Sequence, residues 1–316
     1  MRIVFIGTSS FGIPMLKRLI SLKKNIVAVV TQPDRPAGRG KQMSSSPIKM
    51  SASQAGLYLF QPENINTDSA IREIKRLKPD LIILVAYGQI LSKEILEIPT
   101  LGCLNIHPSL LPKYKGPAPI NWTLIKGEEE TGITFLFMNE KIDTGDIIFQ
   151  KKISILPEEN FEQLSTRLAE ESANSLEEVL LSIEKGECKR FLQPKEKYFY
   201  ARKICKDDCC IDWNQKAVDI YNLIRGLACL PGSFTKFKGK RIKISEAIMV
   251  EKSEEDSNYY SQKAGTIVEL SRTAIMVLAG DGNLVGLKKL IPAGSKEMDA
   301  LAFINGYHIR IGDIFN

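Results

Sequence analysis

The chain has 316 residues and a net charge of +6, with 44% hydrophobic and 25% charged residues. This composition is that of a globular protein with its own core, and it excludes intrinsic disorder, a collagen-like repeat and a coiled coil. The length exceeds that of a typical domain, so we expect two domains.

The termini, apolar runs and cysteines predict a cytoplasmic protein that does not enter a membrane. The longest apolar run, residues 81–87, is far shorter than the about 20 residues that span a bilayer, and the first strand turns polar at once, unlike a signal peptide. The cysteines at 205, 209 and 210 lack the paired spacing and the four ligands of a structural zinc site. We therefore expect reduced thiols and no bound metal.

The first 186 residues alternate strand-like and helix-like patterns. We expect strands at 1–7, 26–31, 81–87, 102–106, 132–138 and 146–155, and helices at 11–22, 51–56, 68–78, 118–127 and 160–185. Residues 34–49 are polar and rich in Gly, Pro and Ser, which predicts a long loop. Such alternation predicts an α/β, Rossmann-like domain with a mostly parallel sheet, whose ligands bind at the carboxyl ends of the strands.

The pattern changes after residue 186. Residues 187–204 read as a basic linker, followed by a helix at 215–227 and short strands at 233–237, 241–247, 265–270, 274–279 and 284–292. Regularly spaced short strands predict a small β-barrel, here of the OB-like kind. The expected domains are thus 1–186 and 205–316, and the second carries +5 of the net charge together with the linker.

Asn105 and His107 stand two residues apart at the end of a predicted strand, so their side chains share one face. A neutral imidazole can accept a proton from an incoming nucleophile, and a neighbouring amide can hydrogen-bond a developing oxyanion. Asp143, in a polar turn, could orient and stabilise the protonated imidazole. A structural histidine at a strand end and a turn aspartate that bonds its own backbone are equally open at this point.

Two basic segments are candidates for phosphate contacts. The loop at 33–41 carries Arg35, Arg39 and Lys41 without matching acids. The predicted strand pair at 236–243 interleaves its cations with apolar residues, which would place several of them on one face of the barrel, namely Lys236, Lys238, Lys240, Arg241 and Lys243. Solvated hairpin charges are the alternative for this second segment. By contrast, the turn between Gly7 and Gly12 matches neither the dinucleotide nor the P-loop pattern.

Taken together, these segments resemble the methionyl-tRNA formyltransferase family over nearly the whole chain. The wider group of enzymes that use 10-formyltetrahydrofolate is marked by Asn-Ile-His-Pro-Ser-Leu-Leu-Pro at 105–112 and by the later Asp-Thr-Gly at 143–145. The loop Pro-Asp-Arg-Pro-Ala-Gly-Arg-Gly-Lys at 33–41 is similar to the tRNA enzymes rather than to the purine-pathway or sugar-nucleotide formyltransferases. Segments 3–8, 116–120, 142–147 and 211–213 extend the resemblance.

The resemblance implies transfer of a formyl group from 10-formyltetrahydrofolate to the amino group of initiator methionyl-tRNA by a monomer. Residues 1–186 would be the catalytic domain, and 205–316 would bind tRNA. Asn105 would stabilise the oxyanion, His107 would handle the amine proton, and Asp143 would hold His107 in its tautomer. The folate pocket would be lined by Val85, Ala86, Tyr87, Gly88, Gln89, Ile90, Leu91, Ser109, Leu110, Leu111 and Pro112.

Three other functions stay open. The first two are a formyltransferase with another amine acceptor and a formyltetrahydrofolate hydrolase. The basic barrel and the arginine-rich loop favour tRNA over another acceptor. The third is an inactive tRNA-binding protein of the same fold, against which the presence of Asn105, His107 and Asp143 argues.

Overall fold

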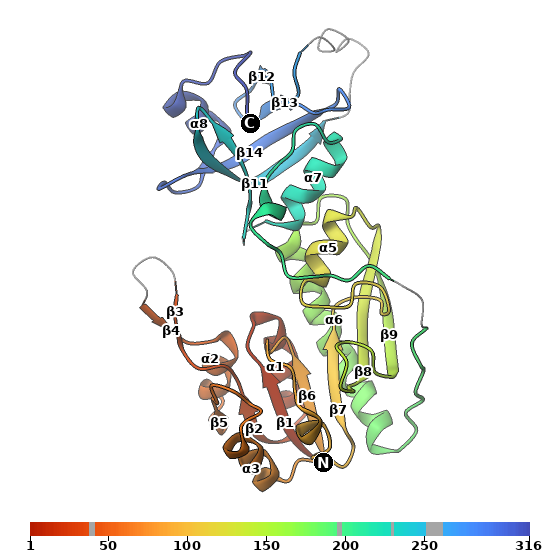
Figure 1. The fold of residues 1–316 in the computed structure, drawn as a ribbon. Helices are drawn as coiled ribbons and strands as arrows, with labels where there is room; N and C mark the ends of the chain where they lie inside the picture. Colours follow the sequence, from red (N-terminus) through yellow and green to blue (C-terminus); the bar gives the residue numbers. More distant parts are fainter. Residues whose placement is uncertain (38–41, 195–197, 229–230, 251–261) are drawn as a thin grey trace. The chain divides into compact units, whose positions relative to one another are not determined.

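The computed structural model describes residues 1–37, 42–194, 198–228, 231–250 and 262–316, and the chain forms two compact units (Figure 1). The first unit comprises Met1–Pro119, Glu130–Ser154 and Ser165–Ala201. The second comprises Ile120–Glu129, Ile155–Leu164 and Arg202–Asn316. The domain bounds expected at 186 and 204 stay a prediction. In the described part of the chain, no helix is long and apolar enough to cross a membrane.

The first unit is built on a seven-stranded sheet in the order β5-β2-β1-β6-β7-β8-β9 (Figure 1). The first five of these strands run parallel, and β8 and β9 are antiparallel additions at one edge. The strands are β1 (Arg2–Gly7), β2 (Asn25–Val30), β5 (Leu59–Phe60), β6 (Leu81–Val85), β7 (Cys103–His107), β8 (Glu130–Phe137) and β9 (Ile147–Ser154). The predicted Rossmann-like, mostly parallel sheet is confirmed.

The strand order reverses between β1 and β6. The chain leaves β1 to add β2 on one side and then returns to add β6 on the other. At this point the backbone amide of Thr8, just after β1, donates to the carbonyl of Ala86, just after β6, at 3.3 Å. Open α/β sheets bind ligands at this reversal, outside the carboxyl ends of the strands.

The helices of the first unit bury the apolar residues of one side, and α2 and α3 are also capped at their first turns. The side chains of Ser46 and Thr67 accept hydrogen bonds from the first turns of α2 and α3. Alternate strand residues such as Val4, Ile6 and Ile82 pack with the buried side of α3. The helices are α1 (Ile13–Ser21), α2 (Pro47–Gln54), α3 (Asp68–Leu77), α4 (Lys93–Leu96) and most of α6 (Phe161–Glu184).

The long loop expected at 34–49 is wrong in part. A short hairpin, β3 (Arg35–Ala37) and β4 (Gln42–Ser44), leaves the sheet here (Figure 1), and α2 begins at Pro47 rather than at residue 51. The polar residues serve local bonds: the carboxylate of Asp34 accepts from Lys49 Nζ at 2.6 Å and from Ser45 Oγ at 3.1 Å. These bonds hold the base of the hairpin, and composition does not reveal them.

The second unit contains an antiparallel sheet in the order β10-β11-β14-β13-β12, which confirms the predicted change to a domain of short strands. The C-terminal residues connect its two edges: Asn316 exchanges two backbone hydrogen bonds with Lys236 of β10, and Ile267 of β12 donates to Asp313 at 2.8 Å. The strands are β10 (Ser233–Phe237), β11 (Lys240–Val250), β12 (Ile267–Leu270), β13 (Ile275–Leu278), β14 (Leu284–Pro292) and β15 (Met298–Asp299). The helices are α5 (Pro119–Ile125), α7 (Ala217–Gly226) and α8 (Ala300–Tyr307), the last of which we did not predict.

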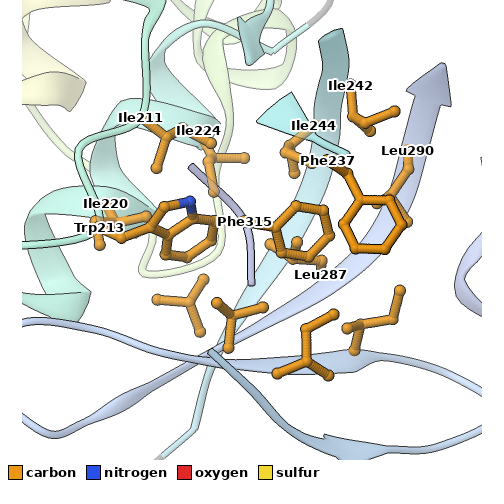
Figure 2. Close-up of a cluster of buried hydrophobic side chains, with 14 of the residues drawn as sticks. Ile211, Trp213, Ile220, Ile224, Phe237, Ile242, Ile244, Leu287, Leu290 and Phe315 are labelled. Carbon is orange, nitrogen blue, oxygen red and sulfur yellow. The ribbon is translucent and has the colours of Figure 1, made fainter. Parts of the chain in front are cut away.

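The core of the second unit explains the Ile-Asp-Trp motif at 211–213. Ile211 and Trp213 are buried between α7 and the sheet, and Trp213 stacks on Phe315 with ring centroids 6.0 Å apart (Figure 2). The indole Nε1 donates to Thr235 Oγ1 at 3.0 Å, which satisfies its polar atom inside the core. This motif is therefore part of the packing of the second unit.

Candidate active site

Strand β7 carries Asn105 and His107 to the edge of the sheet where ligands bind in this fold class. Their side chains share one face, and they are 8% and 5% exposed. The parallel neighbour β6 and the antiparallel neighbour β8 fix the backbone of β7 on both sides. Both side chains are thus held by a rigid sheet, which suits groups that must be placed accurately.

Asp143 comes from the loop between β8 and β9 and meets both of these side chains. Its Oδ1 accepts from Asn105 Nδ2 at 3.1 Å, and its Oδ2 accepts from the Gly116 amide at 2.8 Å. The same Oδ2 lies 3.7 Å from His107 Nδ1. The structure therefore brings together the three predicted catalytic residues, although Asp143 follows His107 by 36 positions along the chain.

The tautomer of the neutral His107 ring is decided by a contact that we did not predict. The ring Nε2 lies 3.0 Å from the carbonyl oxygen of Tyr114, in a buried position. A carbonyl only accepts hydrogen bonds, so Nε2 carries the hydrogen and Nδ1 of the neutral ring has the lone pair. The tautomer that we expected Asp143 to hold is thus selected by Tyr114, a backbone group that no sequence pattern signals.

The electrostatics of the site are set by a cation beside the carboxylate. The ammonium of Lys115 interacts with Asp143, which favours its charged form, but burial dominates and lowers the pKa of Lys115. An amide donor, an imidazole with an available nitrogen and a carboxylate therefore meet at one point next to a positive charge. This set of groups is suited to acyl transfer, because it can bind an oxyanion and move a proton.

The predicted folate segments directly follow β6 and β7, so they lie at the carboxyl ends of the strands, where the catalytic residues also lie. In segment 85–91, Ala86, Gly88 and Ile90 are exposed, Gln89 is half-buried, and Val85, Tyr87 and Leu91 are buried. Burial raises the pKa of the Tyr87 hydroxyl to about 12. In segment 109–112, Ser109 and Leu111 are buried, while Leu110 and Pro112 are half-buried.

Ser109 belongs to a hydrogen-bonded bracket that shapes the loop after β7. Its hydroxyl donates to the Lys113 carbonyl at 2.8 Å, and its own carbonyl accepts from Thr134 Oγ1 at 2.6 Å. Gln150 Nε2 donates to Thr134 Oγ1 and to the carbonyl of Leu111. Sequence reasoning missed Thr134 and Gln150 because they lie on β8 and β9, far along the chain from the loop after β7 that they hold.

The predicted tRNA-binding residues occupy different settings. Arg35 pairs with Glu63 at 2.5 Å on the surface, and Arg39 and Lys41 lie outside the described residues. The register of β10 and β11 places Lys236 opposite Arg241, and Phe234 opposite Lys243. These four share the face of the sheet opposite the core drawn in Figure 2. On this face Phe234 is buried against Cys209 and Leu227, and the Arg241 guanidinium lies 3.6 Å from the Phe234 ring centroid.

The remaining two cations of this hairpin do not share that face. Lys238 lies in the turn, with a left-handed φ of 46°, and its ammonium is 3.8 Å from the carboxylate of Asp313. Lys240 is opposite Phe237 at the end of the strand pair, on the side of the buried residues. The alternation that we used therefore places three of the five predicted cations together, and it fails where the turn begins.

Comparison with known proteins relates both parts of the chain to formyl transferases. Residues 1–180 match the family model described as formyl transferase, and residues 203–308 match the formyl transferase C-terminal domain. The methionyl-tRNA formyltransferase of Trichlorobacter lovleyi is 38% identical over 99% of this chain and 96% of its own. That of Alkaliphilus metalliredigens is 41% identical over 99% of this chain and 97% of its own.

The fold is also similar to a solved structure. HypX from Aquifex aeolicus, in complex with tetrahydrofolic acid, superposes with a TM-score of 0.68 over 99% of this chain and 48% of that chain, at 19% identity. This likeness concerns the fold, whereas the full-length relatives and the family models decide membership. The chain belongs to the methionyl-tRNA formyltransferase family.

Proposed function

We propose that this protein transfers the formyl group of 10-formyltetrahydrofolate to the amino group of initiator methionyl-tRNA, giving N-formylmethionyl-tRNA for translation initiation. The observation that carries the proposal is the meeting of Asn105, His107 and Asp143 at the carboxyl end of β7. Full-length relatives that bear this enzyme name support the choice of substrates.

In the first step, the methionyl amino nitrogen attacks the formyl carbon and the carbonyl electron pair moves to oxygen. One hydrogen of the Asn105 amide bonds Asp143, which leaves the second for the oxyanion. Because the bond to Asp143 fixes the amide plane, this donor is already oriented before charge develops. Such preorganised donors typically contribute about 10²–10³ in rate.

In the second step, the attacking nitrogen gives its proton to Nδ1 of His107, and the tetrahedral intermediate collapses. The bond from the formyl carbon to N10 of the folate breaks, and the departing nitrogen takes the proton from the imidazolium. The Asp143 carboxylate, 3.7 Å from Nδ1, stabilises the imidazolium while it exists. The proton lost by the attacking amine thus ends on the leaving nitrogen of the folate, and the reaction needs no other acid or base.

The formyl donor would lie along the segments after β6 and β7. Exposed Ala86, Gly88 and Ile90, with half-buried Leu110 and Pro112, offer backbone groups and apolar surface beside the catalytic residues. HypX, a protein of similar fold, is in complex with tetrahydrofolic acid, which supports a folate as the co-substrate. The donor is a co-substrate, and the proposed mechanism uses no metal.

The tRNA would contact the outer face of β10 and β11 through Lys236, Arg241 and Lys243, and the β3–β4 hairpin through Arg35. Backbone phosphates bound by several cations make affinity fall steeply with salt. We propose a monomer in the cytoplasm, where charged initiator tRNA is available. Size-exclusion chromatography with light scattering tests the oligomeric state.

The decisive experiment measures formyl transfer from 10-formyltetrahydrofolate to charged initiator methionyl-tRNA, beside a reaction without acceptor. Product only in the presence of the acceptor supports the proposal. Formate released without acceptor would make the protein a hydrolase, and formylation of other amines would change the acceptor. If none of these reactions shows turnover but the protein still binds tRNA, it is an inactive tRNA-binding protein. The variant His107→Ala should lose transfer by about 10²–10⁴ while binding tRNA as before.

A further inference from the structure

A segment that the sequence analysis treated as a linker lies against both loops of the active site. We call residues 191–194 and 198–201 the strap. Phe191 and Ile147 exchange backbone hydrogen bonds of 2.8 and 2.9 Å, so the strap borders β9 just after the Asp143 loop. At its other end, the Tyr114 amide donates to Phe199 at 3.1 Å, and the Ala201 amide donates to Lys115 at 2.7 Å. The strap therefore holds the loop that selects the His107 tautomer and the loop that carries Asp143.

Gln193 makes the most specific of these contacts. Its Nε2 donates to the backbone carbonyls of Asp143 and Gly145, both at 2.9 Å. The two amide hydrogens thus bond the carbonyl oxygens of the two residues that flank Thr144, one of which is Asp143 itself. Within the part of the chain that the structure describes, the buried Oε1 of Gln193 has no hydrogen-bond partner. Its bonding is therefore entirely through the nitrogen.

The bond pattern requires a donor with two hydrogens on one nitrogen. Both acceptors are carbonyl oxygens, so a carboxylate at this place would be repelled, and an apolar side chain would leave two carbonyls without their bonds. Asp143 also has a left-handed φ of 50°, which a residue with a side chain seldom adopts without external support. Gln193 supplies such support at the carbonyl that follows this torsion.

We propose that Gln193 is a positioning residue of the catalytic site, which acts through Asp143. By holding the Asp143 and Gly145 carbonyls, it keeps the Asp143 carboxylate against the Asn105 amide and beside His107. This inference rests on the proposed function, because it assigns Gln193 a part in that reaction. Within the strap, the side chain of Gln193 is the one to which we assign this part.

The test is a double-mutant cycle on formyl transfer by the full chain, with Gln193→Met, Asp143→Ala and the pair combined. Methionine keeps the volume of glutamine and removes both donors. We expect Gln193→Met to lower kcat by about 10–100-fold, because misplacement of a catalytic group by about 1 Å costs this much. The KM for each substrate should stay within about twofold of the wild type. In the Asp143→Ala background, Gln193→Met should change kcat by less than about twofold, because the group that it positions is already absent.

The matched control is Leu192→Ala, at the neighbouring strap residue, whose side chain is 85% exposed. It should keep the wild-type kcat and melting temperature. Equal losses in Leu192→Ala and Gln193→Met, or additive effects of Gln193→Met and Asp143→Ala, would overturn the proposal. An unchanged kcat in Gln193→Met would do the same.

If Gln193→Met does not fold, Gln193→Asn replaces it, because it keeps the amide but is one methylene too short to reach both carbonyls. It carries the same expectations and the same refutations. The activity of the wild-type protein distinguishes a failure of the proposed function from a failure of the inference about Gln193. An inactive wild type would contradict the proposed function, whereas an active wild type with an equally active Gln193 variant would contradict this inference only.

Discussion

Nε2 of His107 lies 3.0 Å from the carbonyl oxygen of Tyr114, a residue with a left-handed φ of 59°. The backbone amide of Tyr114 donates in turn to the carbonyl of Phe199, and this second hydrogen bond holds the backbone of Tyr114 in place. Because the carbonyl accepts only, Nδ1 is the nitrogen of the neutral ring that can take a proton. The orientation of the proposed base thus depends on the backbone of a loop seven residues further along the chain.

This relationship predicts the tautomer of His107. In ¹⁵N-edited NMR spectra of the protein near pH 8, the neutral ring of His107 should carry its hydrogen on Nε2. Assignment is direct because the chain has two histidines, and His308→Asn removes the signals of the other. Asparagine suits that position, which ends α8 in the left-handed region. A hydrogen on Nδ1 of His107 would contradict the assignment.

Removal of the proposed oxyanion donor should affect catalysis and leave binding intact. Asn105→Ala should lower kcat by about 10²–10³, since one preorganised donor is lost. The matched control is Asn121→Ala, because Asn121 is 9% exposed and its Nδ2 donates to the Gly226 carbonyl at 2.8 Å in the second unit. The control should lower the melting temperature but keep kcat. Equal kcat losses in both variants would argue against the assigned role of Asn105.

The Asp143 loop should not tolerate a side chain at Gly145. A Cβ at this position would lie 1.7 Å from the Phe137 carbonyl oxygen, so the loop must move. Gly145→Ala should therefore destabilise the protein by about 1–3 kcal/mol, as overpacking does, and reduce formyl transfer. Gly306→Ala, in α8, meets nothing within 4 Å and should be neutral or stabilising by up to about 1 kcal/mol. Thermal melting of both variants checks the contrast in sign.

An ion pair near the start of the second unit predicts a loss of stability in acid. The Arg202 guanidinium donates to both carboxylate oxygens of Asp208 and lowers the pKa of that carboxyl. Because the folded pKa lies below the unfolded value of about 3.9, the pair stabilises the fold above that pH. This contribution is lost as the pH falls through the lowered pKa. Urea unfolding of the wild type and Asp208→Asn should differ at pH 6 and converge toward pH 3, and a constant difference would refute the linkage.

Much of the first unit could be predicted because its signals are local. The buried run at 81–85 and the alternation that ends at His107 show where strands lie. Strands joined by a crossover helix usually run parallel, as β1 and β2 do, but β7 and β8 run antiparallel although α5 lies between them. The hairpin at 35–44 was missed because polar residues that flank it bond one another, as Asp34 does with Lys49 and Ser45, and such bonds leave no periodic pattern. The helix at 300–307 was missed because it is short and apolar on most sides, so its residues show no helical alternation of polar and apolar positions.

The sequence by itself determined the kind of groups available for chemistry. Asn105 and His107 share a face because strand geometry alternates every residue, whatever the rest of the chain does. Only the tertiary structure decided how these groups work together. Three other segments supply the remaining groups, namely the Asp143 carboxylate, the Tyr114 carbonyl and the Gln193 amide. The Tyr114 group is a backbone carbonyl, and the Gln193 amide donates to backbone carbonyls. Backbone groups are the same in every residue, so their roles arise only when folding places them beside a particular side chain.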